Sequence, residues 1–257
     1  MIISYQGRIV APDEAHIPIT STSLQFGQGV FESFLITEGK AFQLQEHLQR
    51  FIGSSLAVKL PYTFTPSELT GWVASAFHAA PSPVSRVKVL GTSEGVWVLC
   101  QPIDPVSSAP WKLQSYQGRR SLAEIKSTSY LECLLAHQNA VEAGADEALL
   151  CNHHGKIYEG SRSNFYWISQ GRLRSKNRGV LPGITREFIA KNHPGGIHWE
   201  GLNIDQLEHI QGAMVSNAVR GLIPVCQIDQ HPIPVSDQVN EVCSWFNQER
   251  AKNMITL

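Results

Sequence analysis

The sequence has almost no excess of charge of either sign. Its 21 lysine and arginine residues nearly balance 22 aspartate and glutamate residues, which leaves a net charge of −1. Surfaces that bind nucleic acid or anionic membranes are usually basic, so this balance predicts neither kind of partner. With 42% hydrophobic and 17% charged residues, the composition also excludes intrinsic disorder, collagen-like repeats and coiled coils. Such a composition is typical of a soluble enzyme or binding protein.

Two further absences bear on where the protein works. The five cysteines are odd in number and contain no C-x-x-C pair, which is typical of a reducing compartment. The first residues lack the basic flank and the long apolar stretch of a secretory signal. No run approaches the roughly 18 apolar residues needed to span a bilayer. We therefore expect a cytoplasmic protein without a membrane anchor.

The common catalytic and metal-binding motifs are missing as well. Gly27-Gln-Gly29 lacks the third glycine of a dinucleotide-binding loop, and neither a P-loop nor a G-x-S-x-G nucleophile motif occurs. His153 and His154 fall in a predicted turn, with no carboxylate or cysteine at the spacing of a metal ligand. The sequence therefore predicts no metal site.

Hydrophobic periodicity and turn residues predict two α+β lobes. Prolines and serines between 101 and 110 indicate an extended linker, so we expect a small N-terminal domain over 1–106 and a larger domain over 107–257. Leu131, Leu134 and Leu135 are predicted to lie on the apolar face of an amphipathic helix, and Pro182 in the first turn of another. Strands are expected at 86–90, 96–100, 148–151, 156–158 and 164–168, and helices at 44–56, 130–144, 182–189 and around 239–246.

Motifs with the order and spacing of one enzyme family run along nearly the whole chain. These motifs are Phe26-Gly-Gln-Gly-Val-Phe-Glu32, Glu46-His-Leu-Gln-Arg50, Ile125-Lys126-Ser-Thr-Ser-Tyr130-Leu131, Gly144-Ala-Asp-Glu-Ala-Leu-Leu150, Glu159-Gly-Ser-Arg-Ser-Asn164-Phe165 and Gly179-Val-Leu-Pro-Gly-Ile-Thr-Arg186. Together they resemble the fold-type IV pyridoxal phosphate (PLP) family, which includes D-amino acid and branched-chain aminotransferases and 4-amino-4-deoxychorismate lyase. The resemblance implies a two-lobed fold, PLP as the cofactor and a small-molecule substrate.

The resemblance implies catalytic roles for two residues. Lys126 is implied as the catalytic lysine, which binds the aldehyde of the cofactor as a Schiff base and later moves a proton. Glu159 is implied to keep the pyridine nitrogen protonated, so that the ring can act as an electron sink. Without the resemblance, Lys126 would be read as a solvated surface lysine and Glu159 as a glutamate at the end of a turn.

The phosphate of the cofactor needs several converging donors. Ile184 and Thr185 open a predicted helix, whose unpaired amides and dipole favour an anion. The resemblance adds Arg50, which can bind phosphate through two parallel donors, and the turn that contains Asn217 and Ala218. By periodicity alone, Arg50 lies off the apolar face of its helix and would be solvated.

Three departures from the aminotransferase patterns favour the lyase within this family. Tyr130 follows Lys126 one residue sooner than is usual in branched-chain aminotransferases. Phe31 stands where D-amino acid aminotransferases usually have a tyrosine, and Ser216-Asn217-Ala218 is similar to the asparagine-containing turn of the lyases. We therefore expect an aminodeoxychorismate lyase, which releases pyruvate and 4-aminobenzoate for folate biosynthesis.

Other readings of the sequence stay open. Leu90-Gly91 stands where many lyases have Arg-Gly, which leaves a class IV aminotransferase of the branched-chain or D-amino acid type as the alternative. A PLP-binding protein without catalysis is a third possibility. The resemblance also implies a homodimer, and Trp72, Phe77 and Trp97 are predicted to supply more apolar surface than a small lobe buries by itself.

Overall fold

The computed structural model describes residues 1–105, 107 and 109–257. The chain divides into two compact units. Unit 1 contains Met1–Pro105, Ile125–Ser129 and Ala251–Leu257, and unit 2 contains Val106–Glu124 and Tyr130–Arg250. Each unit has its own β-sheet with helices packed on it, which agrees with the mixed architecture predicted from the sequence.

The units differ in composition from the predicted domains of 1–106 and 107–257. Residues 125–129 and 251–257 belong to unit 1, although they follow the predicted boundary. Residue 106, at that boundary, lies outside the described residues. The domain division itself stays a prediction.

In the described part of the chain, unit 1 is built on a seven-stranded sheet in the order β16-β4-β3-β5-β6-β1-β2. The pairs β3–β5 and β5–β6 are antiparallel over their whole lengths. The strands expected at 86–90 and 96–100 are therefore present as β5 and β6, are longer than expected, and pair as a hairpin. The strands are β1 (Ile2–Tyr5), β2 (Arg8–Val10), β3 (Val30–Thr37), β4 (Lys40–Phe42), β5 (Val84–Thr92), β6 (Gly95–Pro102) and β16 (Met254–Thr256).

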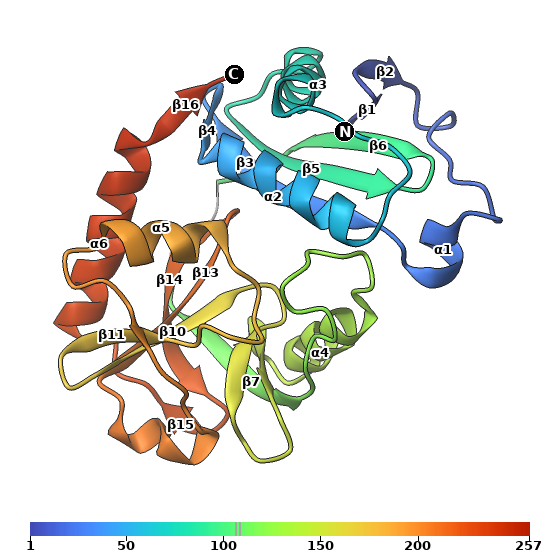
Figure 1. Ribbon diagram of the computed structural model, residues 1–257. Coiled ribbons are helices and arrows are strands. Elements are labelled where there is room, and N and C mark those ends of the chain that lie inside the picture. The colour runs from blue at the N-terminus through green and yellow to red at the C-terminus, as the bar shows by residue number, and fades with distance from the viewer. Residues whose placement is uncertain (106, 108) are drawn as a thin grey trace. The chain divides into compact units, whose positions relative to one another are not determined.

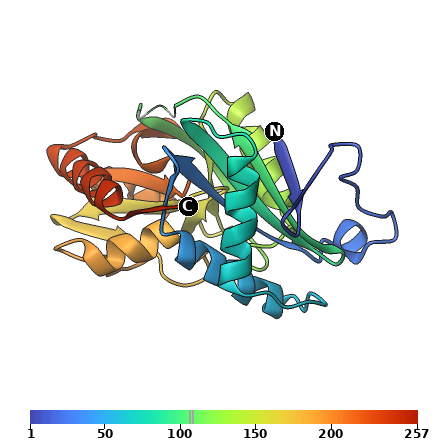
Figure 2. The ribbon, with the colours of Figure 1, turned by 90° about the horizontal axis from the view of Figure 1, so that it is seen from above.

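Two helices of unit 1 pack against this sheet and against each other, α2 (Leu44–Ala57) on β3 and α3 (Pro66–His78) on β1, β2, β5 and β6 (Figures 1 and 2). The apolar spacing in α2 places Leu44, Leu48 and Phe51 in the core. A capping box between Thr65 and Glu68 starts α3, a helix that the sequence analysis did not predict. A short helix, α1 (Thr22–Phe26), precedes β3.

Trp97 and Phe77 are buried within unit 1. Trp97 packs with Ile3 and Val10, and its ring centroid lies 4.5 Å from that of Tyr5. The prediction that these aromatic residues provide surface for a dimer is therefore wrong for both, because one chain already covers them.

Among the described residues, unit 2 has a nine-stranded sheet in the order β12-β11-β10-β13-β14-β7-β8-β9, with β15 paired to β14 (Figure 1). The pairs β7–β8, β7–β14 and β11–β12 are parallel, and the other neighbours are antiparallel. The strands are β7 (Trp111–Gln117), β8 (Glu147–Cys151), β9 (Ile157–Gly160), β10 (Asn164–Ser169), β11 (Arg172–Ser175), β12 (His198–Trp199), β13 (Gly212–Asn217), β14 (Gly221–Ile228) and β15 (His231–Pro232).

Helix α4 (Leu131–Glu142) packs on β7 and β8 through small residues. Its buried face consists of Cys133, Ala136 and Ala140, whereas Leu131, Leu134 and Leu135 are 67%, 48% and 47% exposed. The prediction that the leucines form the packed face is therefore wrong. Small side chains let the helix approach the sheet closely, so the larger ones are left on the outside.

The other helices of unit 2 are α5 (Ile184–Asn192), the 3₁₀ helix η1 (Ile204–His209) and α6 (Asp237–Lys252). Helices α5 and α6 are both labelled in Figure 1, and they contact each other through rings, with 6.4 Å between the centroids of Phe188 and Phe246. Pro182 precedes the N-cap residue Gly183, so it does not lie in the first turn of α5 as predicted. No helix in the described residues has the length and apolar character needed to cross a membrane.

Candidate active site

The residues predicted to bind the cofactor are divided between the two units. Lys126 and Arg50 belong to unit 1. Glu159, Ile184, Thr185, Asn217 and Ala218 belong to unit 2. We describe the two groups separately, and the roles of these residues stay predictions.

Lys126 lies on a segment that pairs with the start of β3. Its carbonyl oxygen accepts a hydrogen bond from the Phe31 amide at 2.9 Å, and the Thr128 amide donates to the Gly29 carbonyl at 2.8 Å. The next residue, Ser127, pairs with Val30 in an isolated bridge, so the segment at Lys126 is not part of a regular strand. The two hydrogen bonds flank Ser127, so pairing with the start of β3 fixes the backbone that directly follows Lys126.

The glycines before β3 allow this close approach. A Cβ atom on Gly29 would lie 2.7 Å from the Thr128 hydroxyl and 2.9 Å from the Gly91 carbonyl oxygen. Gly27 has a φ of +68°, and a Cβ atom there would lie 2.6 Å from the Ser129 hydroxyl. The Gly-Gln-Gly pattern is thus a packing requirement of the lysine segment.

The side-chain nitrogen of Lys126 lies over an aromatic ring. Its Nζ atom is 4.7 Å from the centroid of Phe31, and Nζ of Lys88 is 4.9 Å from the same centroid. Burial lowers the pKa of Lys88, and the charge of Arg86 lowers it further. Two amines therefore converge on the ring that stands where D-amino acid aminotransferases usually carry a tyrosine.

Arg50 is held by a buried carboxylate that the sequence analysis did not select. Its Nε and Nη2 atoms donate to the two oxygens of Glu32 at 2.7 and 2.8 Å, and His47 Nδ1 lies 2.8 Å from Glu32 Oε2. The Arg50 side chain is only 12% exposed, so the solvated reading from periodicity is wrong. Glu32 and His47 occur in two of the quoted motifs, and an acidic residue inside an apolar strand was the available signal.

The charges in this cluster are well defined. Burial by itself raises the pKa of Glu32, but the Arg50 guanidinium and the hydrogen bonds from His47 and Arg50 outweigh burial and lower it to about 2. Burial lowers the pKa of His47, against the effect of its bond to Glu32. The imidazole is therefore neutral at pH 7 and donates through Nδ1, while Glu32 is an anion paired with Arg50.

In unit 2, Glu159 is a buried carboxylate at the end of β9. Its Oε2 atom accepts a hydrogen bond from the Leu181 amide at 3.0 Å, and the Asn164 side-chain amide lies 3.5 Å away. The same Asn164 amide donates to the Leu181 carbonyl oxygen at 2.9 Å. Glu159 Oε1 lies 3.7 Å from Nη1 of Arg120. These contacts fix the plane of the carboxylate.

Ile184 and Thr185 form the first turn of α5, and Thr185 is buried. The N-cap residue is Gly183, which has no side chain to cap the first amides of the helix. A Cβ atom on Gly183 would overlap Asn164 Oδ1. Glycine is therefore required where α5 begins beside Asn164, and the helix end keeps the character of an anion site.

Asn217 is the last residue of β13, and Ala218 begins the turn that leads to β14. Asn217 Oδ1 accepts hydrogen bonds from the amides of Val219 and Arg220 at 3.1 and 2.8 Å, which stabilises the turn. Ser216 precedes this turn and its hydroxyl lies 2.8 Å from the Tyr166 hydroxyl. The oxygen of the Asn217 side chain thus serves the backbone of its own turn.

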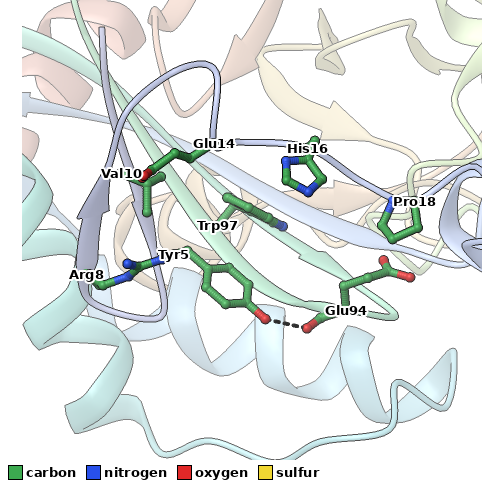
Figure 3. A pocket seen from close by; sticks show the side chains of 8 residues that line it. All are labelled: Tyr5, Arg8, Val10, Glu14, His16, Pro18, Glu94 and Trp97. Atoms are coloured by element: carbon green, nitrogen blue, oxygen red, sulfur yellow. Dashed lines mark hydrogen bonds between the residues drawn. The ribbon is translucent and has the colours of Figure 1, made fainter.

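Two other features of the described residues stand apart from these groups. No set of three or more His, Cys, Asp or Glu side chains is arranged to hold a metal ion in the described part of the chain. A recess of about 270 Å³ in unit 1 is bordered by Tyr5, Glu94 and Trp97 (Figure 3). The Tyr5 hydroxyl donates to the Glu94 carbonyl oxygen at 2.6 Å, and the lining of the recess includes none of the predicted site residues.

Comparisons with known proteins match the chain over most of its length. The family model described as amino-transferase class IV matches residues 29–228. A D-alanine aminotransferase from Staphylococcus aureus (strain N315) is 26% identical over 273 residues, which covers 93% of this chain and 95% of that protein.

Solved structures are similar in fold. The branched-chain aminotransferase from Thermoproteus uzoniensis, crystallised with norvaline, has a TM-score of 0.91 and 22% identity, covering 100% of this chain and 99% of that one. The branched-chain amino acid aminotransferase from T.th., with pyridoxamine 5'-phosphate, has a TM-score of 0.89 and 22% identity, covering 99% and 98%. The predicted fold class is confirmed by this likeness.

Proposed function

Because the chain belongs to the class IV aminotransferase family, whose cofactor is PLP, we propose that it is an aminotransferase that moves an amino group from an amino acid to a 2-oxo acid. The observation that carries this proposal is the pairing of the Lys126 segment with β3, which holds an amine at the family position. Similarity to aminotransferases over almost the whole chain supports the transferase above the lyase that the sequence analysis preferred.

The described residues fit this cofactor. The first turn of α5, with Gly183 at its N-cap, suits a phosphate, and the Asn217–Ala218 turn is proposed to support it. Arg50 would bind the phosphate with its guanidinium oriented by Glu32. Glu159 is proposed to hold a proton at the pyridine nitrogen, because its carboxylate is buried and oriented by Leu181 and Asn164.

PLP, when bound, supplies an aldehyde that takes up a primary amine and a ring that withdraws electrons. The chain would contribute the proton transfers and the orientation. Lys126 Nζ is the proposed base that would remove a proton from the α-carbon of the amino acid. It would then deliver a proton to the carbon of the cofactor that carries the aldehyde. Its position over Phe31 limits where the amine can lie. Glu159 would hold the proton at the pyridine nitrogen during the whole reaction, since its contacts with Leu181 and Asn164 need not change.

Transamination itself is the first test. The purified protein with PLP is incubated with D-alanine, L-leucine or L-valine and 2-oxoglutarate, and glutamate is measured. We expect glutamate with at least one donor, and a rate about a thousandfold lower in Lys126→Ala, since that variant loses the base. Mass spectrometry after borohydride reduction should place the cofactor on Lys126. Reduction onto another lysine would remove Lys126 from this role.

The lyase is the second candidate, favoured by one observation. The turn Ser216-Asn217-Ala218 is similar to that of the lyases, and Asn217 stabilises it through two backbone hydrogen bonds. Incubation with aminodeoxychorismate decides between the candidates by following pyruvate and 4-aminobenzoate. Formation of both products without glutamate from any tested amino acid would make the lyase the function.

The proposal includes a homodimer in the cytoplasm. Leu131, Leu134 and Leu135 on α4 leave an apolar face exposed on the single chain, which supports a partner surface there. Light scattering at micromolar concentration should give twice the mass of 28.5 kDa. A monomer under these conditions would contradict the dimer and leave the aminotransferase proposal standing.

A further inference from the structure

Glu147 is a buried carboxylate that the proposed chemistry does not use. It lies at the start of β8, opposite Leu113 of β7, with none of its surface exposed. A carboxylate in such a place is costly unless donors surround it. Its burial in the sheet therefore indicates a structural role.

Its partners come mostly from one short turn. Oε1 accepts hydrogen bonds from the Ala148 amide at 2.9 Å and from the Ser161 hydroxyl. Oε2 accepts one from the Ser163 hydroxyl at 3.2 Å and lies 3.8 Å from Nε of Arg162. Burial raises the pKa of Glu147, and these neighbours act against that effect. Three successive residues of the turn thus converge on one side chain.

The turn is also closed on itself around this carboxylate. The Gly160 amide donates to the Ser163 carbonyl at 2.7 Å, and the Ser161 amide donates to the Ala148 carbonyl at 3.0 Å. A Cβ atom on Gly160 would overlap Ser163 Oγ and lie 3.2 Å from Glu147 Cγ. The Tyr130 hydroxyl donates to the Ser161 carbonyl at 2.5 Å. No space is left for the turn to shift while Glu147 stays in place.

The residues on either side of the turn are Glu159 and Asn164. Both bind Leu181, through its amide at 3.0 Å and its carbonyl oxygen at 2.9 Å. Asn164 Oδ1 also occupies the space beside Gly183, where α5 begins. A movement of the turn would therefore reach the Glu159 carboxylate and the first turn of α5 together.

We propose that Glu147 is a positioning residue that holds the 160–163 turn, and through it sets the Glu159 carboxylate and the start of α5 for the cofactor. The cofactor part of this proposal rests on the proposed function. The bracing of the turn is independent of it, because every contact lies within unit 2. The two can therefore fail separately.

The test compares Glu147→Ala, Glu147→Gln and the control Asp229→Asn. Asp229 follows β14, on the other side of β7 from β8, and accepts a hydrogen bond from the Ser115 amide at 2.7 Å. In the cofactor-free protein, hydrogen exchange is measured on peptides covering 157–166, 179–186 and 212–228. We expect about tenfold faster exchange in the first two for Glu147→Ala, because several buried donors lose their acceptor, and no change in the third.

The same variants are then titrated with PLP by quenching of tryptophan fluorescence. The dissociation constant should rise about tenfold in Glu147→Ala, and less than about threefold in Glu147→Gln, which keeps one acceptor oxygen. The pH at which the visible absorbance of the PLP-loaded protein titrates should move in Glu147→Ala and return in Glu147→Gln. Asp229→Asn should match the wild type in each measurement.

A folded Glu147→Ala with wild-type exchange in both peptides and a dissociation constant within about twofold would overturn the proposal. If Glu147→Ala does not fold by circular dichroism, the Ser161→Ala, Ser163→Ala double variant replaces it, with the same expected results and the same overturning result. A wild-type protein that does not bind PLP at all would overturn the proposed function. The exchange measurements would still decide whether Glu147 holds the turn.

Discussion

Glu32 in unit 1 and Glu147 in unit 2 are both fully buried glutamates on β-strands, yet their pKa values shift in opposite directions. Glu32 has a guanidinium bound to both oxygens at 2.7 and 2.8 Å, and its pKa is lowered to about 2. Glu147 has hydroxyl and amide donors and the Arg162 guanidinium at 3.8 Å, whose side chain is 44% exposed, and burial raises the pKa of Glu147. Burial is common to both, so the close cation makes the difference.

The comparison separates two ways of placing a carboxylate in a protein interior. Glu32 is an ion that orients another ion, because Arg50 cannot turn without breaking two short charged hydrogen bonds. Glu147 gathers neutral donors from a turn, so its charge is less important than its acceptor oxygens. Removing a charge from the Glu32 pair in unit 1 should therefore lower the stability of the protein more than removing a charge at Glu147 in unit 2.

The largest effect is expected from Arg50→Met, which leaves the Glu32 carboxylate buried without its cation. The free energy of unfolding should fall by about 3 kcal/mol or more, because an uncompensated buried charge is costly. Urea denaturation measures this. Arg86→Met, an exposed arginine of the same unit, should change stability by less than about 0.5 kcal/mol. Equal effects of both substitutions would mean that the Glu32 charge is not paired as described.

The second largest effect is expected from acid, which should lower the free energy of unfolding by protonating Glu32. A lowered pKa means that the folded state binds the proton less tightly than the unfolded state, so this stabilisation is present above pH 4.5 and is lost as the pH falls toward about 2. Each pKa unit corresponds to about 1.4 kcal/mol, so the loss is about 3 kcal/mol. Comparing denaturation of the wild type and Glu32→Gln at several pH values isolates it. A pH dependence that Glu32→Gln leaves unchanged would refute this origin.

Glu147→Gln should have a smaller effect, of about 1 kcal/mol or less, because its amide keeps one acceptor and the serine hydroxyls can rotate to accept. Its pH dependence has the opposite sign. A raised pKa means that stability is fully present below pH 4.5 and is lost as the pH rises through the folded-state value. Glu147→Gln should therefore flatten the stability curve between pH 4.5 and neutrality. A steeper curve in this range would contradict the raised pKa.

The smallest effect is expected from Arg162→Met. The guanidinium lies 3.8 Å from Glu147 and is 44% exposed, so the ion pair should contribute less than about 1 kcal/mol. Stability measured in low and high salt should differ only slightly between this variant and the wild type. A loss as large as that in Arg50→Met would show that the two glutamates are held in the same way.

Local features of the fold could be predicted from the sequence. The apolar spacing of Leu44, Leu48 and Phe51 predicted α2, and the turn predicted at His153 and His154 separates β8 from β9. Helix α3 was missed, although Thr65 and Glu68 have the spacing of a capping box. Each of these signals depends on residues within one or two turns of each other, so no knowledge of the rest of the chain is needed.

The packed face of α4 could not be predicted from local signals of this kind. Periodicity identified an apolar stripe that contains Leu131 and Leu134, but could not choose between that stripe and the small residues Cys133 and Ala136. The distance between the helix and β8 decided the choice, because only small side chains fit between them. The leucine stripe is consequently an exposed surface on the single chain.

For the candidate site, the sequence by itself determined the residue types, their motifs and the glycines that open space beside Lys126 and Asn164. The tertiary structure alone decided that Lys126 belongs to unit 1, that Arg50 is bound by Glu32, and that Glu147 contacts the turn after Glu159. The physical reason is that these contacts join residues far apart along the chain. Desolvation and charge pairing exist only once folding has brought such residues together, so no local pattern specifies them.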